Sequence, residues 1–268
     1  MVRKLIKYDF QSYLRLLLPA QLVLIGIAAL NRIVQLFEDT GSSIYNITFA
    51  SSAALYGIGI VALWLLTIIV ALVRFYQGMY SHEGYLSHTL PVTPSQHILS
   101  KLFTYVIFSL GAVLAIFVSL CVITLGEVNF ELFKAFLYLM REFFRYFQVN
   151  GALFIIEFLL LSVASVMAEM LMLYMCISIG QLAKKKKILL SVGVFFGLYV
   201  IGQIISTILI IIGTLNAEAL SELYQTIEKH PIPFLHILFC GWLVVQAALG
   251  LIFFFISKHI MEKKLNLT

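Results

Sequence analysis

Residues 74–101, RFYQGMYSHEGYLSHTLPVTPSQHILSK, decide the fold, because they form a long polar interval between two strongly apolar segments. Pro91 and Pro94 fall within this interval, and proline breaks or ends regular structure. The pattern predicts a segment that leaves a membrane, turns and returns to it.

The composition of the whole chain supports a membrane location. Of its 268 residues, 62% are hydrophobic and only 12% are charged, and the mean hydropathy is +1.01. Ordinary soluble domains are about 45–50% apolar and about 25% charged. The apolar runs are continuous rather than alternating, which favours helices over a β-barrel. The sequence therefore predicts an all-α, polytopic membrane protein.

We expect a single transmembrane domain over residues 1–268 with six spans. The spans are predicted at 16–36, 52–73, 102–125, 151–182, 188–214 and 234–256. Residues 1–14 alternate apolar and basic positions at helical spacing, which predicts an amphipathic helix lying in the membrane interface. Helical loops are expected on the outer side at 126–150 and 215–233.

The basic residues predict the orientation. Thirteen of the 18 Lys and Arg residues fall on the side of the N-terminus, and the exceptions are Arg32, Lys134, Arg141, Arg145 and Lys229. Cytoplasmic loops carry the excess of Lys and Arg. We therefore expect a multi-pass protein of the cell membrane, with both termini and the 74–101 loop in the cytoplasm. The positive net charge is explained by this bias, so no nucleic-acid partner is expected.

The outer loop at 126–150 is unusually rich in Phe and Tyr. Aromatic rings favour the headgroup level, which indicates a helix at the outer surface. The same pattern fits a helix that packs on the bundle of spans. The helix could serve as an outer lid or as a contact with a second chain.

The sequence contains no motif for binding ATP or a catalytic metal ion. The chain contains no G-x-x-x-x-G-K-[ST], so it should not bind ATP by itself. His82 and His88 are six residues apart, not the four that zinc proteases use, and the three cysteines lie in apolar segments without ligand spacing. We expect no catalytic site, no metal site and no cofactor on this chain, which is not an enzyme on its own.

Two acidic residues, Glu157 and Glu169, lie inside the fourth span. Ionisable groups at membrane depth are costly and are candidates for function. Ser165 and Glu169 share one helix face, expected to point into the bundle or a cavity. Glu157, Glu169 and Ser165 are therefore candidates for a substrate path; the alternative is an acid hydrogen-bonded between helices.

The polar interval also carries a pattern, R-F-Y-x-x-x-Y-S-x-E-G-Y-L-S-x-T-L-P-V-T-P-x-Q-x-x-L-S-K-L, that resembles the membrane subunits of bacterial ABC-2 type exporters. The stretches KYDFQSYLRLLLP, LNRI and ISIGQLAKKKKILLS are similar to that family as well. The resemblance implies the ABC-2 permease fold: six spans, an amphipathic helix before the first, a coupling helix between the second and third, and a short outer helix before the sixth.

The resemblance further implies two partners, a separate cytoplasmic ABC ATPase and a second permease chain, identical or paralogous. ATP and Mg would be held by the ATPase, and the segment around residues 81–90 would dock on it. The residues carried over for coupling are Ser81, Glu83, Gly84, Tyr85, Leu86 and Pro91. Of these, Glu83 would pair with or cap groups of the ATPase, Tyr85 and Leu86 would be apolar plugs, and Pro91 would fix the exit.

The expected function is therefore outward transport of an amphipathic or hydrophobic substrate, such as a peptide, lipid or drug, driven by ATP. Two other classes stay open: an ATP-independent channel or carrier for small solutes, and the substrate-binding subunit of an energy-coupling importer. Composition does not choose among substrates.

Overall fold

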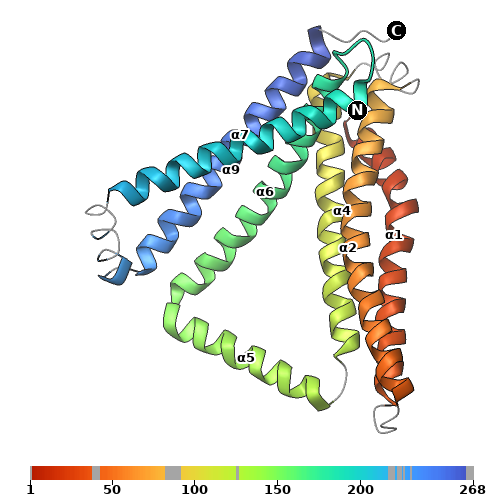
Figure 1. Ribbon diagram of the computed structural model, residues 1–268, viewed down its shortest axis with the longest axis vertical. Helices are drawn as coiled ribbons and strands as arrows, with labels where there is room; N and C mark the ends of the chain where they lie inside the picture. Colours follow the sequence, from red (N-terminus) through yellow and green to blue (C-terminus); the bar gives the residue numbers. More distant parts are fainter. Residues whose placement is uncertain are drawn as a thin grey trace. The chain divides into compact units, whose positions relative to one another are not determined.

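The computed structural model describes residues 2–37, 43–81, 92–124, 127–216, 221, 225, 227–229 and 231–263. The chain is drawn from end to end in Figure 1. Seven long helices make up the described part. They are α1 (Val2–Gln35), α2 (Ser43–Tyr80), α4 (Pro94–Ile123), α5 (Glu127–Phe147), α6 (Val149–Gly180), α7 (Lys187–Leu215) and α9 (Pro231–Lys263).

Six of these helices are long and apolar enough to cross a membrane, and α5 is the exception. This confirms the predicted polytopic, all-helical class. The six helices have between 29 and 38 residues, whereas about 20 residues cross the hydrocarbon core. Their ends therefore extend into the headgroup layers or beyond. We name the ends of each unit separately: the near side is the end where α1 begins in the first unit and the end where α9 ends in the second, and the opposite end of each unit is its far side.

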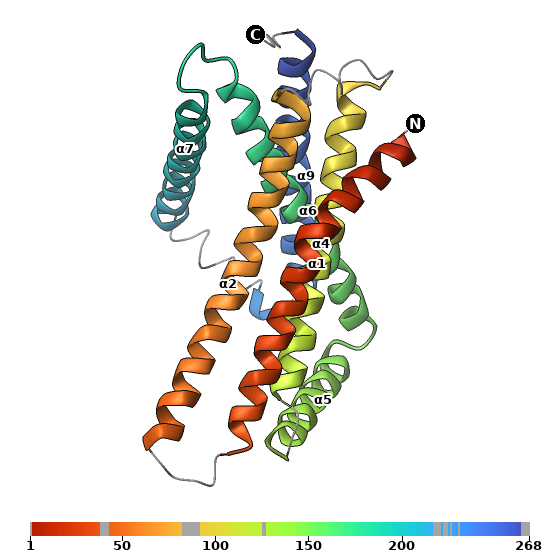
Figure 2. The same cartoon turned by 90° about the vertical axis from the view of Figure 1, so that its right-hand side faces the viewer.

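The helices form two compact units, residues 1–141 and 142–268. In the first unit α1, α2 and α4 run side by side, as both views show (Figures 1 and 2). Their shared core combines small and large side chains, namely Leu24, Ala28, Tyr56, Leu63, Ala112 and Ala115. Small residues let helix backbones approach closely where no hydrophobic effect drives helices together. A buried hydrogen bond of 2.8 Å between the hydroxyls of Tyr56 and Ser119 adds a polar contact between α2 and α4.

The first helix differs from the expected arrangement. Residues 2–14 are not a separate helix but the first turns of α1, which continues unbroken through Pro19. The apolar side chains of this segment have a helical partner: the rings of Phe10 and Tyr13 lie 5.0 and 5.6 Å from that of Phe108 in α4. Pro19 has no N–H to donate to the carbonyl of Arg15, which lies at the polar start of the apolar run.

The second unit contains α6, α7 and α9. Helix α9 packs along α6, with Gly250 against Ala168 and Leu171. Helix α7 meets α6 where the two are joined, with Gly180 against Lys187 and Ser191. No residue of α7 is buried, so almost its whole apolar surface is left for lipid or for another chain.

Much of the polar interval at 74–101, which was expected to be a loop, belongs to the two flanking helices. Helix α2 continues to Tyr80, and α4 begins at Pro94, where proline is well tolerated because the first N–H groups of a helix lack partners. The backbone N–H of Thr93 donates to Oε1 of Gln96 at 3.2 Å and caps the helix. The predicted 126–150 loop is helical as α5. Of the predicted 215–233 loop the structure describes residues 215, 216, 221, 225, 227–229 and 231–233, the last three as the start of α9.

The close packing of the first unit leads to a prediction about Ala28, which is fully buried. Replacing Ala28 by Leu forces extra methylene groups into the α1–α2–α4 core, which should cost about 1–3 kcal/mol of stability. Thermal unfolding in mild detergent would measure it. The control is Ala54→Leu on an exposed position of α2, which should have little effect. Equal effects of the two substitutions would contradict this packing.

Candidate functional site

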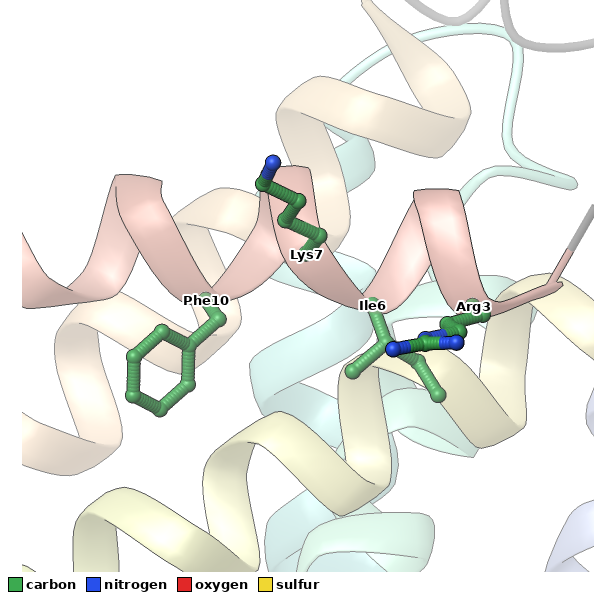
Figure 3. A pocket seen from close by; sticks show the side chains of 4 residues that line it. All are labelled: Arg3, Ile6, Lys7 and Phe10. Carbon is green, nitrogen blue, oxygen red and sulfur yellow. The ribbon is translucent and has the colours of Figure 1, made fainter.

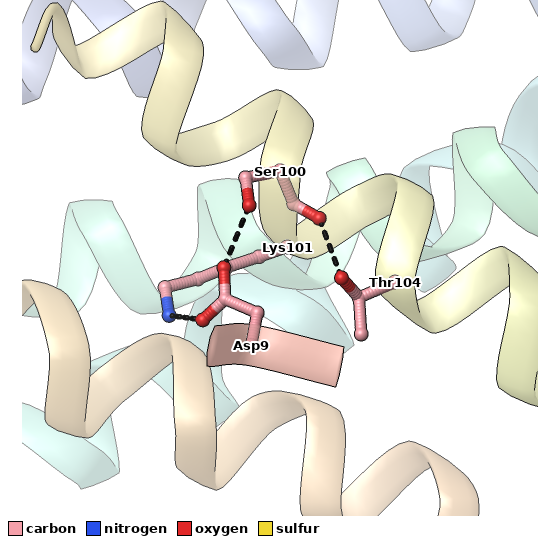
Figure 4. Close-up of polar contacts among 4 residues, drawn as sticks. All are labelled: Asp9, Ser100, Lys101 and Thr104. Atoms are coloured by element: carbon pink, nitrogen blue, oxygen red, sulfur yellow. Dashed lines mark hydrogen bonds and ion pairs between the residues drawn. The ribbon is translucent and has the colours of Figure 1, made fainter. Parts of the chain in front are cut away.

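A buried polar cluster joins α1 to α4 on the near side (Figure 4). The ammonium of Lys101 donates to Oδ1 of Asp9 at 3.0 Å, and the hydroxyl of Ser100 donates to Oδ2 at 2.7 Å. The side chains of Lys101 and Asp9 are only 8% and 15% exposed. Both carboxylate oxygens thus have partners, which is what a charge with little access to water requires. We call Asp9, Ser100 and Lys101 the near-side cluster.

Helix α2 also contacts this cluster, through Gly78. A Cβ added at Gly78 would lie 2.8 Å from Nζ and 3.1 Å from Cε of Lys101. A side chain at this position would therefore have to displace the end of Lys101 from its place beside Asp9. Gly78 is in the last turn of α2 and Lys101 in the second turn of α4, so the cluster holds together both helices that lead to the undescribed segment 82–91.

The first turns of α1 also border an open hollow lined by Arg3, Ile6, Lys7 and Phe10 (Figure 3). These four residues fall on one face of the helix, with two apolar and two cationic side chains. Such a face can cover apolar surface while its charged ends stay in water. A single helix lines the hollow, so it is a surface feature rather than an enclosed binding site.

The predicted coupling residues can be placed only in part. Ser81 directly follows the last residue of α2 and is partly buried. Glu83, Gly84, Tyr85, Leu86 and Pro91 lie outside the described residues. Their predicted roles therefore stay predictions, although the two helices that carry this segment are described on both sides of it.

A second polar site joins α6 to α9 toward the far side. Nδ1 of His236 lies 2.7 and 2.9 Å from the two carboxylate oxygens of Glu157. The thiol of Cys240, one turn along α9, is 3.8 Å from the same carboxylate. The side chains of His236 and Glu157 are 21% and 22% exposed. We call Glu157 and His236 the far-side pair.

Aromatic rings hold the histidine in place. The ring of Phe154 stacks on that of His236 with centroids 4.0 Å apart and planes within 5°. Phe147, the last residue of α5, packs edge-on against Phe154 at 5.1 Å. Nε2 of His236 is buried and makes no hydrogen bond to any residue that the structure describes. One hydrogen-bonding position of the far-side pair is therefore open among the described residues.

The other two predicted path residues are placed differently. Glu169 is exposed, with no hydrogen bond or ion pair to the described residues, although it was expected to face the bundle or a cavity. The reason is geometric: α9 crosses α6 at Ala168 and Leu171, and at about 100° per residue both point well away from Glu169. Ser165 is partly buried and does not join the far-side pair. The structure therefore brings none of the three candidates together.

His236 is the residue that sequence reasoning missed. It lies in the second turn of α9, and Glu157 lies in the third turn of α6. Both helices begin on the far side, so the two residues occupy similar depths. Matching depths of an acid and a histidine in two spans is a usable signal, but it identifies a pair only when the packing of those spans is known.

Within the described ranges, no group of three or more His, Cys, Asp or Glu side chains is placed to hold a metal ion. Comparisons of the chain with protein-family models, with curated proteins and with solved structures give no match.

The near-side cluster predicts a distinctive pattern of stability. Asp9→Leu or Lys101→Met alone leaves one charge buried without its partner, a loss of about 3–5 kcal/mol for a fully buried pair and less here, since Asp9 keeps some exposure. The double variant removes both charges and should lose clearly less than either single variant. Thermal unfolding in mild detergent measures all three. Lys134→Met on α5, where the side chain is 55% exposed, is the control. Additive losses would show that the two charges do not depend on each other.

The far-side pair predicts coupling between α6 and α9. His236→Phe keeps a ring that can stack on Phe154 but leaves the Glu157 carboxylate without its partner, at a cost of about 1–3 kcal/mol. Glu157→Ala should cost a similar amount, and the double variant less than the sum. A double-mutant cycle of unfolding free energies, with Glu131→Ala on exposed α5 as control, would measure the coupling. A coupling of zero would mean that the contact carries no energy.

Proposed function

We propose that this chain is the permease subunit of an ATP-driven ABC-2 type exporter, working with a separate cytoplasmic ATPase. One observation carries most weight: the near-side cluster ties α1, α2 and α4 together at the base of the segment that bears the exporter-like motif. The six helices that are long enough to cross a membrane are strongly apolar. This composition suits a subunit that moves amphipathic or hydrophobic cargo.

The proposed mechanism begins at residues 81–91. Closure of the ATPase dimer, driven by ATP and Mg bound there, pushes on this segment through Glu83, Tyr85 and Leu86. Ser81 directly follows α2 and Pro94 is the first residue of α4, so a movement of the segment between them would displace both helices. The ion pair between Lys101 and Asp9 passes it on to α1. The pair adds a polar contact to the packing of α1 on α2 and α4, which favours movement of the three helices together.

Charge supports the orientation used in this proposal. The near side carries most of the lysines and arginines, including the run Lys184–Lys187 between α6 and α7. Such an excess is typical of the cytoplasmic side, where an ATPase would bind. The proposed location is the cell membrane of a bacterium, with both termini in the cytoplasm.

A second permease chain, identical or paralogous, completes the proposed transporter. Helix α7 has no buried residue, and a Cβ added at Gly193 or Gly197 would meet nothing within 4 Å. Glu169 is exposed at span depth, where an unpaired acid is costly in lipid. These surfaces suit contact with another chain. In this proposal the far-side pair, Glu157 and His236, would lie in the outer part of the substrate path.

The proposal is tested by isolating the chain from its native membrane in mild detergent and identifying co-purifying proteins by mass spectrometry. We expect a stoichiometric P-loop ATPase. The variant Glu83→Ala/Tyr85→Ala should lose it while eluting like the native chain in size-exclusion chromatography, because the docking contacts are gone but the spans are intact.

The matched control is Glu131→Ala/Tyr138→Ala, which makes the same two changes at exposed positions of α5 on the far side. It should retain the ATPase. If no ATPase accompanies the native chain, or if both variants keep it equally, the exporter proposal fails. An ATP-independent channel or carrier is then the better reading.

A further inference from the structure

Helix α5 is the long described helix that does not span the membrane, and its two faces differ sharply. At about 100° per residue, its large apolar side chains fall on one arc and its charged side chains on the opposite arc. The apolar arc consists of Leu132, Phe133, Phe136, Leu137, Leu139, Met140, Phe143, Phe144 and Phe147. The charged arc consists of Glu131, Lys134, Arg141, Glu142 and Arg145.

We propose that α5 lies in the plane of the membrane on the far side, with its apolar arc inserted at the boundary between lipid headgroups and acyl chains. The partner of this surface is the lipid of the far leaflet. This inference does not depend on the proposed transport function, because it uses only the chain's connections and the arrangement of its side chains.

The connections determine the direction of the helix axis. Helix α4 ends at Ile123 and α5 begins at Glu127, while α5 ends at Phe147 and α6 begins at Val149. With 21 residues, α5 is about 31 Å long. If it stood upright, one end would lie about 30 Å from the membrane, and a link of three residues reaches only about 10 Å. Both ends must therefore stay near one membrane surface.

The lengths of the flanking spans place that surface at the headgroups. Helices α4 and α6 have 30 and 32 residues, or about 45 and 48 Å. A bilayer with its headgroups is about 40–45 Å thick. Each flanking helix therefore reaches the headgroup level of the far leaflet at the point where it joins α5.

The corner between α5 and α6 determines which arc faces the membrane. Gln148 turns the chain with a positive φ of 49°, an uncommon conformation outside glycine. Gly151 is buried at this corner, and an added Cβ would lie 3.1 and 3.2 Å from the rings of Phe144 and Phe143. Both rings belong to the apolar arc. Since this arc contacts the first turn of a spanning helix, it faces the membrane and not the water.

The exposure of the arc identifies lipid as its partner. Leu132, Phe133, Phe136, Leu137 and Leu139 are each between 50% and 62% exposed. On the charged arc, Lys134 and Arg145 lie 3.4 and 3.3 Å from Glu131 and Glu142 one turn away, as on a face turned to water. An apolar arc opposite a charged one is the pattern of helices that lie about 5–10 Å into the interface.

The test is a scan of single spin labels along α5 in the full chain, reconstituted in lipid bilayers, with Cys121, Cys176 and Cys240 replaced by Ala. Labels at 132, 136 and 139 should be accessible to oxygen, which concentrates in lipid, and placed about 5–10 Å below the headgroups. Labels at 134, 141 and 145 should instead be accessible to a water-soluble nickel chelate. A label at Ile205, exposed on spanning α7, gives the reference for the hydrocarbon.

Three results would overturn the inference. Equal access of the nickel chelate to both arcs would place α5 clear of the membrane. Low access of both reagents along the apolar arc would mean that protein covers it, as a lid on the bundle would. Spin–spin broadening between identical labels at 136 would assign the arc to a second copy of the chain. A label at 205 that behaves as expected shows that the chain without its native cysteines is correctly inserted.

Discussion

In the hydrocarbon of a bilayer every backbone N–H and C=O must find its partner within the protein, and this requirement shapes the whole chain. It leaves the helix as the available element for continuous apolar runs, and all long elements of the described chain are helices. It also removes most of the hydrophobic effect between helices, because lipid is as apolar as leucine. Close approach at small residues such as Ala28 and Ala112, and a few polar contacts, must then hold the spans together.

Those polar contacts are not spread evenly. Among the described residues, the ionisable pairs between helices are Asp9 with Lys101 at the near side of the first unit and Glu157 with His236 toward the far side of the second, while the hydrogen bond between Tyr56 and Ser119 is a neutral contact of the first unit. Each ionisable pair joins two helices that are distant in sequence, and the side chains of both pairs keep some exposure. The near-side cluster is the more completely satisfied of the two, since both oxygens of Asp9 accept hydrogen bonds. The far-side pair keeps one buried nitrogen, Nε2 of His236, without a described partner.

Hydropathy was enough to predict six spans, because one window of apolar residues per crossing is a strong and local signal. The ends of the helices are less predictable: the polar pattern places Arg74 and Lys101 in a loop, yet both lie within helices that continue past the apolar window. A polar side chain stops an apolar run without stopping the hydrogen bonds of a helix. The contacts between side chains of different helices are the hardest feature to predict. Glu157 stood out by its charge, but its contact with His236 depends on how α9 packs on α6, and the outward position of Glu169 follows from that same packing.

The contacts of the second unit form a continuous path from the surface to the far-side pair. Phe147 ends α5 and packs on Phe154, Phe154 stacks on His236, and His236 contacts Glu157. A shift of the last turn of α5 therefore cannot leave the imidazole undisturbed, since each ring is in direct contact with the next and packed interiors transmit strain. The series of contacts runs in both directions, since Phe154 touches both the ring of Phe147 at the corner and the imidazole of His236. The packing of α9 on α6 and the corner between α5 and α6 therefore share one side chain, Phe154.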